Sequence, residues 1–316
     1  MIPSRLRRDG PLIGPPPRGR SDSGTVRTLA FLAAGVLVGA CGGDPDSPPA
    51  PTVPPSRIVS LAPSHTELLF ALGAGTQVVG VTRFCDRPPE ARGRTVVGDA
   101  VSVSLEKVAS LRPDLVVVNA EGTAAAVGPL GVRTLRVPTD TLENLLDAVG
   151  VLGRAVGREA EARQVERRMR EGLARAREKA AGRPRTRVLL VIQRDPFVVA
   201  GGGSYAHSLL DALGAGNAAG DLPGAWPLVS AEAVLARAPE CIVDASLGPD
   251  GAPSARTEEA AAYWRRFPGI PAVRDGRVRA LADQAALRPG PSLEEALRAL
   301  DASLAPPNEG TAKGAR

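Results

Sequence analysis

The sequence has few aromatic residues and few of the side chains that most often bind metals. Its 316 residues include five Phe, two Tyr, two Trp, two His and three Cys. The cysteines are far apart, and neither a CxxC pair nor a histidine-rich stretch occurs, which excludes a dedicated zinc cluster. Because aromatic rings are so scarce, each Trp and Tyr is a candidate for contact with a ligand.

Excess positive charge is also scarce outside the N-terminus. The formal net charge is +5, but residues 1–40 contain six Arg and two Asp and so account for +4 of it. The rest of the chain is nearly neutral, at about +1, and its sequence has no basic cluster. This balance argues against nucleic acid as a partner.

One apolar run lies near the N-terminus, and it is short. Residues 28–40 read TLAFLAAGVLVGA, which is too short to span a bilayer and typical of the core of a signal peptide. The boundary VGAC, ending at Cys41, resembles the bacterial lipobox, where cleavage leaves a Cys that carries lipid. We therefore predict a lipoprotein signal peptide over residues 1–41, with lipid on Cys41, and a flexible tether over residues 42–56. The alternative is a plain signal peptide with an incidental Cys.

The chain contains an internal repeat. LLFALGAG at residues 68–75 and LLDALGAG at residues 209–216 differ at one position of eight. A second motif recurs with an offset of 126 residues, so that Ser104, Glu106 and Pro113 correspond to Ser230, Glu232 and Pro239. Two halves of similar design are therefore expected.

Each half has the pattern of alternating helices and strands. Ser104 and Ser230 are suited to cap a short helix, and the proline that follows in each half ends it. The β-branched runs after these prolines are typical of buried parallel strands, and residues 57–61 and 187–192 are predicted to open each half as a strand. The expected fold class is α/β, with two doubly wound lobes and parallel sheets joined by one long α-helix.

The joining helix is predicted over residues 157–182. Val165, Met169 and Leu173 recur there at helical spacing and form one apolar face. At 1.5 Å per residue this stretch would extend about 39 Å. A stiff connector of this kind implies that lobe closure is small. The predicted organisation is an N-terminal lobe over 57–156, the linker helix over 157–182, a C-terminal lobe over 183–305 and a disordered tail over 306–316.

Four stretches of the chain resemble the periplasmic substrate-binding proteins of ABC importers, in the helical-backbone class that serves cobalamin, haem and ferric siderophores. They are residues 57–91, 105–118, 226–243 and 287–291. CDRPPEA at residues 85–91, together with Trp226 and Pro227 ahead of Ser230 and Glu232, is most similar to the vitamin B12-binding branch. The resemblance covers residues 57–305.

This resemblance implies a class III periplasmic binding protein. Such a protein has no catalytic activity, holds its ligand between two lobes and delivers it to a membrane permease and its ATPase. The implied ligand is cobalamin or a related corrinoid, with haem or a ferric siderophore as the alternative. We expect a monomer anchored by lipid in the periplasm or at the cell surface, without a metal or cofactor of its own.

Two acidic residues match the family's permease-docking acids, Glu106 and Glu232. The internal repeat independently places one carboxylate at an equivalent helix start in each half, which suits a partner with pseudo-twofold symmetry. The simpler interpretation is that both acids only interact favourably with the helix dipole. The resemblance favours docking.

Resemblance and topology together assign a set of ligand contacts. They are Pro63, Ser64, His65, Phe84, Phe197, Tyr205, Trp226 and Arg288. The flat apolar face of Trp226 suits a corrin or porphyrin ring, and Arg288 can pair with amide or carboxylate groups. Ala100 and Asn119 stand where the B12-binding branch has further pocket Trp residues, so a less aromatic pocket is predicted.

Haem would require a different use of two of these residues. His65 and Tyr205 would then be candidate iron ligands. The alternative for His65 is a polar loop residue that is hydrogen-bonded at a strand end. The glycines at residues 201–203 are expected to let the backbone approach the ligand.

The remaining features indicate binding rather than chemistry. No G-x-S-x-G turn and no motif of paired carboxylates occurs, so the sequence predicts that the protein is not an enzyme. Cys85 and Cys241 fall in different halves, and we expect two free, mostly buried thiols.

Overall fold

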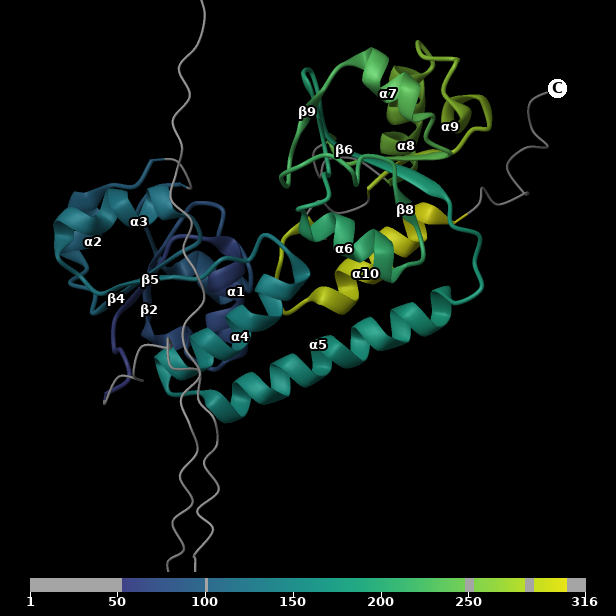
Figure 1. The fold of residues 1–316 in the computed structure, drawn as a ribbon. Coiled ribbons are helices and arrows are strands. Elements are labelled where there is room, and N and C mark those ends of the chain that lie inside the picture. The colour runs from purple at the N-terminus through teal and green to yellow at the C-terminus, as the bar shows by residue number, and fades with distance from the viewer. Residues whose placement is uncertain (1–52, 100–101, 248–252, 282–286, 306–316) are drawn as a thin grey trace, which may run out of the picture. The chain divides into compact units, whose positions relative to one another are not determined.

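The computed structural model describes residues 53–99, 102–247, 253–281 and 287–305 (Figure 1). Several predictions made from the sequence lie outside these residues. They are the signal peptide over 1–41, lipidation at Cys41, most of the tether over 42–56, the residue Ala100 and the tail over 306–316.

The first lobe is built on a five-stranded parallel sheet in the order β3-β2-β1-β4-β5. Its strands are β1 (Ile58–Ser60), β2 (Val78–Val81), β3 (Thr95–Val96), β4 (Leu115–Val118) and β5 (Thr134–Arg136). Its helices are α1 (Pro63–Ala71), α2 (Leu105–Ser110), α3 (Glu121–Val127) and α4 (Leu142–Val156), with 3₁₀ turns η1 (Gly75–Gln77), η2 (Pro89–Gly93) and η3 (Gly128–Leu130). The strand order reverses between β1 and β4, which is where doubly wound sheets open a crevice at their carboxyl edge.

The second lobe has a six-stranded sheet in the order β11-β10-β6-β7-β9, with β8 also paired to β6. Its strands are β6 (Arg187–Arg194), β7 (Phe197–Val199), β8 (Gly216–Asn217), β9 (Leu228–Val229), β10 (Cys241–Asp244) and β11 (Val278–Ala280). Its helices are α6 (Tyr205–Ala212), α7 (Ala231–Arg237), α8 (Pro253–Trp264), α9 (Pro271–Arg274) and α10 (Leu293–Leu304).

The fold class predicted from the sequence is confirmed, with one correction in the second sheet. Strands β8, β10 and β11 run parallel to their neighbours, but β7 is antiparallel to both β6 and β9. Asp195 and Pro196 alone separate β6 from β7. Two residues suffice for a hairpin but not for the crossover that parallel strands require, so this sheet is mixed.

One long helix, α5 (Glu159–Ala180), runs from the first lobe to the second (Figure 1). Its 22 residues correspond to about 33 Å of helix. Val165, Met169 and Leu173 form its buried face, as the spacing predicted. Gly157, at φ 69°, ends the preceding helix α4 in a left-handed cap and turns the chain directly into α5.

Three apolar cores follow from the alternation of side chains along the strands. One face of the first sheet, including Val59 and Val116, packs under α2 and α3, and one face of the second, including Leu189 and Ile242, packs under α7, α8 and α9. The opposite faces of both sheets belong to a single core that also contains the apolar faces of α1, α4, α5, α6 and α10. The two lobes are therefore joined by a common layer of packed helices as well as by one connector.

The internal repeat extends to the backbone conformation. Ser104 caps α2 by accepting a hydrogen bond from the backbone N–H of Lys107, and Ser230 caps α7 in the same way. At the other end of these helices, Arg112 and Ala238 both have φ 44°, again with an offset of 126 residues. Each lies directly before the proline that precedes the next strand.

This left-handed backbone makes Ala238 sensitive to branching at Cβ. We expect Ala238→Val to lower the free energy of unfolding by about 1 to 2 kcal/mol, because a β-branched residue is a strained occupant of positive φ. Ala238→Gly is expected to be near neutral, since relief of strain offsets the added entropy of the unfolded chain. Urea unfolding measures both. Ala236→Val, in the exposed part of the same helix, is the control, and equal losses for both Val variants would contradict the prediction.

Candidate functional site

The carboxyl edge of the first sheet carries a polar network. The Ser64 and Thr139 hydroxyls lie 3.0 Å apart, and the Asn119 side-chain oxygen accepts hydrogen bonds from the backbone N–H and the hydroxyl of Thr139 at 2.9 and 3.0 Å. The Asn119 amide donates to Asp140 at 3.2 Å. Ser64 and Thr139 are buried, whereas Asp140 is exposed and Asn119 partly so. A ligand at this edge would meet the Asn119 amide and the Asp140 carboxylate. The sequence analysis had noted Asn119 only as a position that lacks an aromatic residue.

His65 is fully buried in the first turn of α1, which corrects its assignment as a ligand contact. Its Nε2 donates to the backbone carbonyl of Val137 at 2.7 Å. Burial lowers the pKa of His65 to about 4, against the opposing effects of that hydrogen bond and of Asp140, so the ring is neutral. The structure thus matches the hydrogen bond near a strand end in the alternative interpretation, but His65 lies in a helix and not in a loop. Its ring does not reach solvent, where an iron-bearing ligand would arrive.

Phe197 and Tyr205 are also core residues. Phe197 stacks on Trp264 with ring centroids 5.4 Å apart and is almost fully buried. Tyr205 begins α6, is 1% exposed, and its hydroxyl has no hydrogen-bond partner in the described part of the chain. Burial, followed by the charge of Glu67, raises the pKa of Tyr205, so the phenol stays protonated. The sequence pattern can place Phe197 near a sheet edge, but the strand register decides which way its ring faces.

The glycine loop at residues 201–203 approaches protein rather than open space. Gly201, Gly202 and Gly203 donate backbone hydrogen bonds to carbonyls of the segment 222–225 at 2.9 to 3.1 Å. A Cβ on Gly201 would lie 2.4 Å from the carbonyl oxygen of Gly224. The expected role of these glycines, a close backbone approach to ligand, is corrected to a close approach between two loops, which fixes the segment that carries Trp226.

Phe84 and Trp226 are the two exposed aromatic side chains among the eight that the structure describes. Phe84 is 46% exposed and follows β2 in the first lobe, while Trp226 is 44% exposed and precedes β9 in the second. The Arg83 guanidinium lies 4.8 Å from the centroid of the Phe84 ring and also pairs with Asp99 at 3.0 Å. Each lobe therefore presents one aromatic face to solvent, at residues that the sequence analysis had assigned to the ligand.

Arg288 connects the two lobes. Its guanidinium Nη1 lies 2.5 Å from the Asp86 carboxylate and 3.5 Å from the Phe84 carbonyl, both on the loop that follows β2. Partial burial opposes ionisation of Asp86, but the hydrogen bond and charge of Arg288 outweigh it and lower the pKa of Asp86. Arg288 was expected to contact ligand, and in this structure its partner is a carboxylate of the first lobe. Pro63 is the first residue of α1 and is half-buried. It directly precedes Ser64, which belongs to the polar network described above.

A buried carboxylate that sequence reasoning missed lies at the carboxyl end of β10. Asp244 is fully buried and accepts hydrogen bonds from Arg194 at 2.9 Å and from the Trp264 indole N–H at 2.7 Å. Its other oxygen accepts from the backbone N–H and the hydroxyl of Ser246 at 3.0 and 2.5 Å. The Arg194 guanidinium also lies 4.3 Å from the Tyr263 ring centroid. This network orders the edge of the second sheet.

Glu106 and Glu232 occupy equivalent, exposed positions in the first turns of α2 and α7. A hydrogen bond from the Ser230 side chain, with help from the backbone N–H, lowers the pKa of Glu232. Neither glutamate belongs to the apolar cores, in which the neighbouring Val108 and Val234 are buried. The equivalence expected from the repeat is therefore present in the structure.

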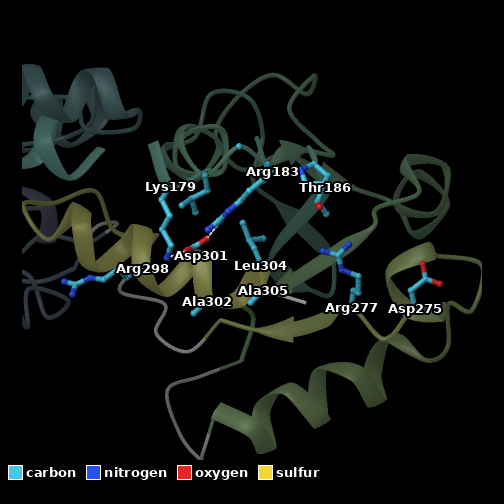
Figure 2. A pocket seen from close by; sticks show the side chains of 14 residues that line it. Lys179, Arg183, Thr186, Asp275, Arg277, Arg298, Asp301, Ala302, Leu304 and Ala305 are labelled. Carbon is cyan, nitrogen blue, oxygen red and sulfur yellow. Dashed lines mark hydrogen bonds and ion pairs between the residues drawn. The ribbon is translucent and has the colours of Figure 1, made fainter. Parts of the chain in front are cut away.

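One cavity lies away from these residues. It measures about 890 Å³ and is lined by the ends of α5 and α10, with Lys179, Arg183 and Asp301 joined across it (Figure 2). None of the eight predicted ligand contacts lines it. A second cavity of about 650 Å³ is bordered by Phe70, Arg87 and Pro291.

Among the described residues, none of the helices combines the length and the apolar character of a membrane span. In the same residues, His, Cys, Asp and Glu form no group of three or more that could hold a metal ion. Cys85 and Cys241 are both buried and free, as expected.

Comparison with known proteins supplies the family. A vitamin B12-binding protein of Salmonella typhimurium is 34% identical over 191 residues, covering 59% of this chain and 71% of that protein. An uncharacterised ABC transporter substrate-binding lipoprotein of Bacillus subtilis is 32% identical over 263 residues, covering 80% of this chain and 81% of that protein.

The chain also matches solved structures of periplasmic binding proteins. A periplasmic haem-binding protein of Pseudomonas aeruginosa matches with a TM-score of 0.68 at 30% identity, covering 81% of this chain and 94% of that one. A periplasmic vitamin B12-binding protein of Vibrio cholerae matches with a TM-score of 0.68 at 26% identity, covering 80% and 97%. These relatives are solute-binding proteins rather than enzymes, as the sequence predicted. The sequence model of the periplasmic binding protein family matches residues 58–285, and this chain belongs to that family.

Proposed function

We propose that this protein is the substrate-binding component of an ABC importer and that it captures cobalamin or a related corrinoid between its two lobes. The observation that carries the proposal is the pair of exposed aromatic side chains, Phe84 on one lobe and Trp226 on the other. Exposed aromatic rings are unusual in a chain with so few of them, and a flat macrocycle is a ligand that both could cover. The relative in Salmonella typhimurium, described as a vitamin B12-binding protein, supports the same ligand class.

The polar edge of the first sheet suits such a ligand. The periphery of a corrin ring carries amide side chains, which donate and accept hydrogen bonds without net charge. Asn119 and Asp140 offer an amide and a carboxylate at the carboxyl end of the sheet, where the buried Thr139 hydroxyl donates to Asn119 and the Asn119 amide donates to Asp140. A small number of fixed polar groups beside apolar faces is the usual composition of a ligand pocket.

Haem is the second candidate, because a solved relative at 30% identity is a periplasmic haem-binding protein. The burial of His65 and Tyr205 weighs against these two residues as iron ligands. If the ligand is haem, neither His65 nor Tyr205 would coordinate its iron, and Phe84 and Trp226 would hold the porphyrin ring. A ferric siderophore remains a third member of the same ligand class.

We further propose that the chain is a lipoprotein anchored through Cys41 and located in the periplasm or at the cell surface. The apolar run at residues 28–40 and the small residues before Cys41 support it, as does the relative in Bacillus subtilis that is described as a lipoprotein. The anchored protein would act with a permease and an ATPase, as a monomer.

Removing the Trp226 ring tests the ligand site. Trp226→Ala is expected to weaken binding of a corrinoid by about 1 to 3 kcal/mol, or roughly 5- to 150-fold, because a stacked aromatic face is lost. Calorimetric titration of the purified protein with cyanocobalamin and cobinamide measures it, with haemin as the competing ligand class. Leu228→Ala, two residues further along the chain and more exposed, is the matched control. Unchanged affinity in Trp226→Ala would remove this ring from the site.

A further inference from the structure

The ion pair between Asp86 and Arg288 lies beside the exposed ring of Phe84. Arg288 also reaches the carbonyl of Phe84, so the pair and the ring share one short loop. About a third of the Arg288 side chain and two fifths of the Asp86 side chain remain exposed to solvent. A ligand resting against Phe84 therefore meets a guanidinium whose charge is already balanced.

Three other cations near the carboxyl ends of the described strands are balanced in the same way. They form the pairs Arg83–Asp99 at 3.0 Å, Arg136–Glu121 at 3.0 Å and Arg194–Asp244 at 2.9 Å. The sequence of the three internal stretches outside the described residues contains no Lys, Arg or His. A ligand carboxylate would have to displace a protein carboxylate to gain Arg288 or any of these three cations.

This charge balance separates two classes of metal macrocycle. A porphyrin such as haem carries two propionate carboxylates, which need cations or water. A corrinoid carries amides at the corresponding positions, and an amide oxygen can share a guanidinium N–H that a carboxylate already neutralises. Removing the Asp86 charge would leave Arg288 as a cation without its carboxylate partner, next to an aromatic face.

We propose that Asp86 is a specificity-determining residue, which neutralises Arg288 and thereby favours an amide-rich corrinoid over a dicarboxylate porphyrin. This inference rests on the proposed function, because it assumes a macrocycle bound against Phe84. It assigns selectivity to a residue that need not touch the ligand. Asp86 acts on the ligand through Arg288.

The test is the selectivity of Asp86→Asn. Asn keeps the shape of Asp and a side-chain oxygen that can accept from Arg288, so the loop that carries Phe84 is retained. We expect haemin to bind about tenfold more tightly to the variant, the effect of one new charge-assisted hydrogen bond, while cobinamide and cyanocobalamin change by less than about threefold. The gain for haemin should shrink as salt rises from about 0.05 to 0.5 M, since half-exposed charges are screened.

Two further variants isolate the charge of Arg288. In the double variant Asp86→Asn with Arg288→Gln, the gain for haemin should vanish. Glu294→Gln removes an equal charge from an exposed ion pair with Arg175 on helices α5 and α10, and its selectivity should equal that of the parent protein. Thermal melting by circular dichroism confirms that each variant is folded before the titration.

The outcomes separate this inference from the function beneath it. If the macrocycles bind to the parent protein and Asp86→Asn leaves the ratio of haemin to corrinoid affinity unchanged, the selectivity role is overturned and the proposed function stands. An equal gain in Glu294→Gln also overturns it, because net charge alone would then explain the effect. If neither class binds to the parent or to any variant, the proposed capture of a corrinoid or haem is refuted, and the selectivity role with it.

Discussion

Replacement of both Glu106 and Glu232 by Ala is expected to abolish ligand uptake in cells that carry the cognate permease and ATPase. Both carboxylates project from exposed first turns, one on each lobe, at equivalent places in the internal repeat. A partner with pseudo-twofold symmetry would contact both carboxylates, so the loss of both removes its charged contacts on both lobes. Ligand affinity should change by less than about twofold, because neither residue packs against the predicted site.

Uptake of labelled corrinoid and calorimetric titration of the purified variant measure the two halves of this prediction. Glu143→Ala with Glu258→Ala is the matched control, since it removes two exposed helical carboxylates, one from each lobe, outside the repeat. The control is expected to support normal uptake. A large loss of ligand affinity in the Glu106 and Glu232 variant would contradict docking, and so would normal uptake.

Asp244→Ala is expected to destabilise the protein by about 3 to 5 kcal/mol, the cost of removing one partner from a buried ion pair. The change leaves Arg194 with a buried charge and strips the indole N–H of Trp264 of its acceptor. The Arg194 guanidinium lies over the Tyr263 ring and Trp264 stacks on Phe197, so displacement of either group disturbs the aromatic cluster of the second lobe. Denaturant unfolding measures the loss, and a fall in Tm on the order of 10 °C should accompany it.

Two further variants define the cause of this loss. Asp244→Asn keeps one acceptor oxygen and should lose less stability than Asp244→Ala. Asp275→Ala breaks an exposed ion pair with Arg274 and should scarcely change the unfolding curve. If Asp244→Ala were as stable as Asp275→Ala, the buried network would not be holding the edge of the second sheet.

The features that the sequence predicts best are those set by local pattern. The two serine caps, the prolines that end α2 and α7, and the strands after them depend on short-range sterics and hydrogen bonds, so the 126-residue offset reappears in the backbone. The apolar stripe of α5 is predicted for the same reason, since a period of 3.6 residues defines which face is buried.

The features that sequence reasoning misplaces depend on tertiary packing. Whether Phe197 faces solvent or core is decided by the register of a hairpin, and one residue of shift would reverse it. Asp244 has the sequence context of an ordinary residue after a strand, and its burial follows from Arg194 and Trp264, which are 50 and 20 positions away. The partner of Arg288 is 202 positions away, so its ion pair could not be read from either motif.

The helical layer between the sheets has a consequence for how this chain can be divided. The repeat suggests two interchangeable modules, yet α4, α5, α6 and α10 bury their apolar faces in one core shared by both halves. A fragment cut at Gly182 would expose part of that layer to water, so neither half is an autonomous folding unit. A chimera that exchanges one lobe with that of a relative should therefore retain folding only if these four helices come from the same parent.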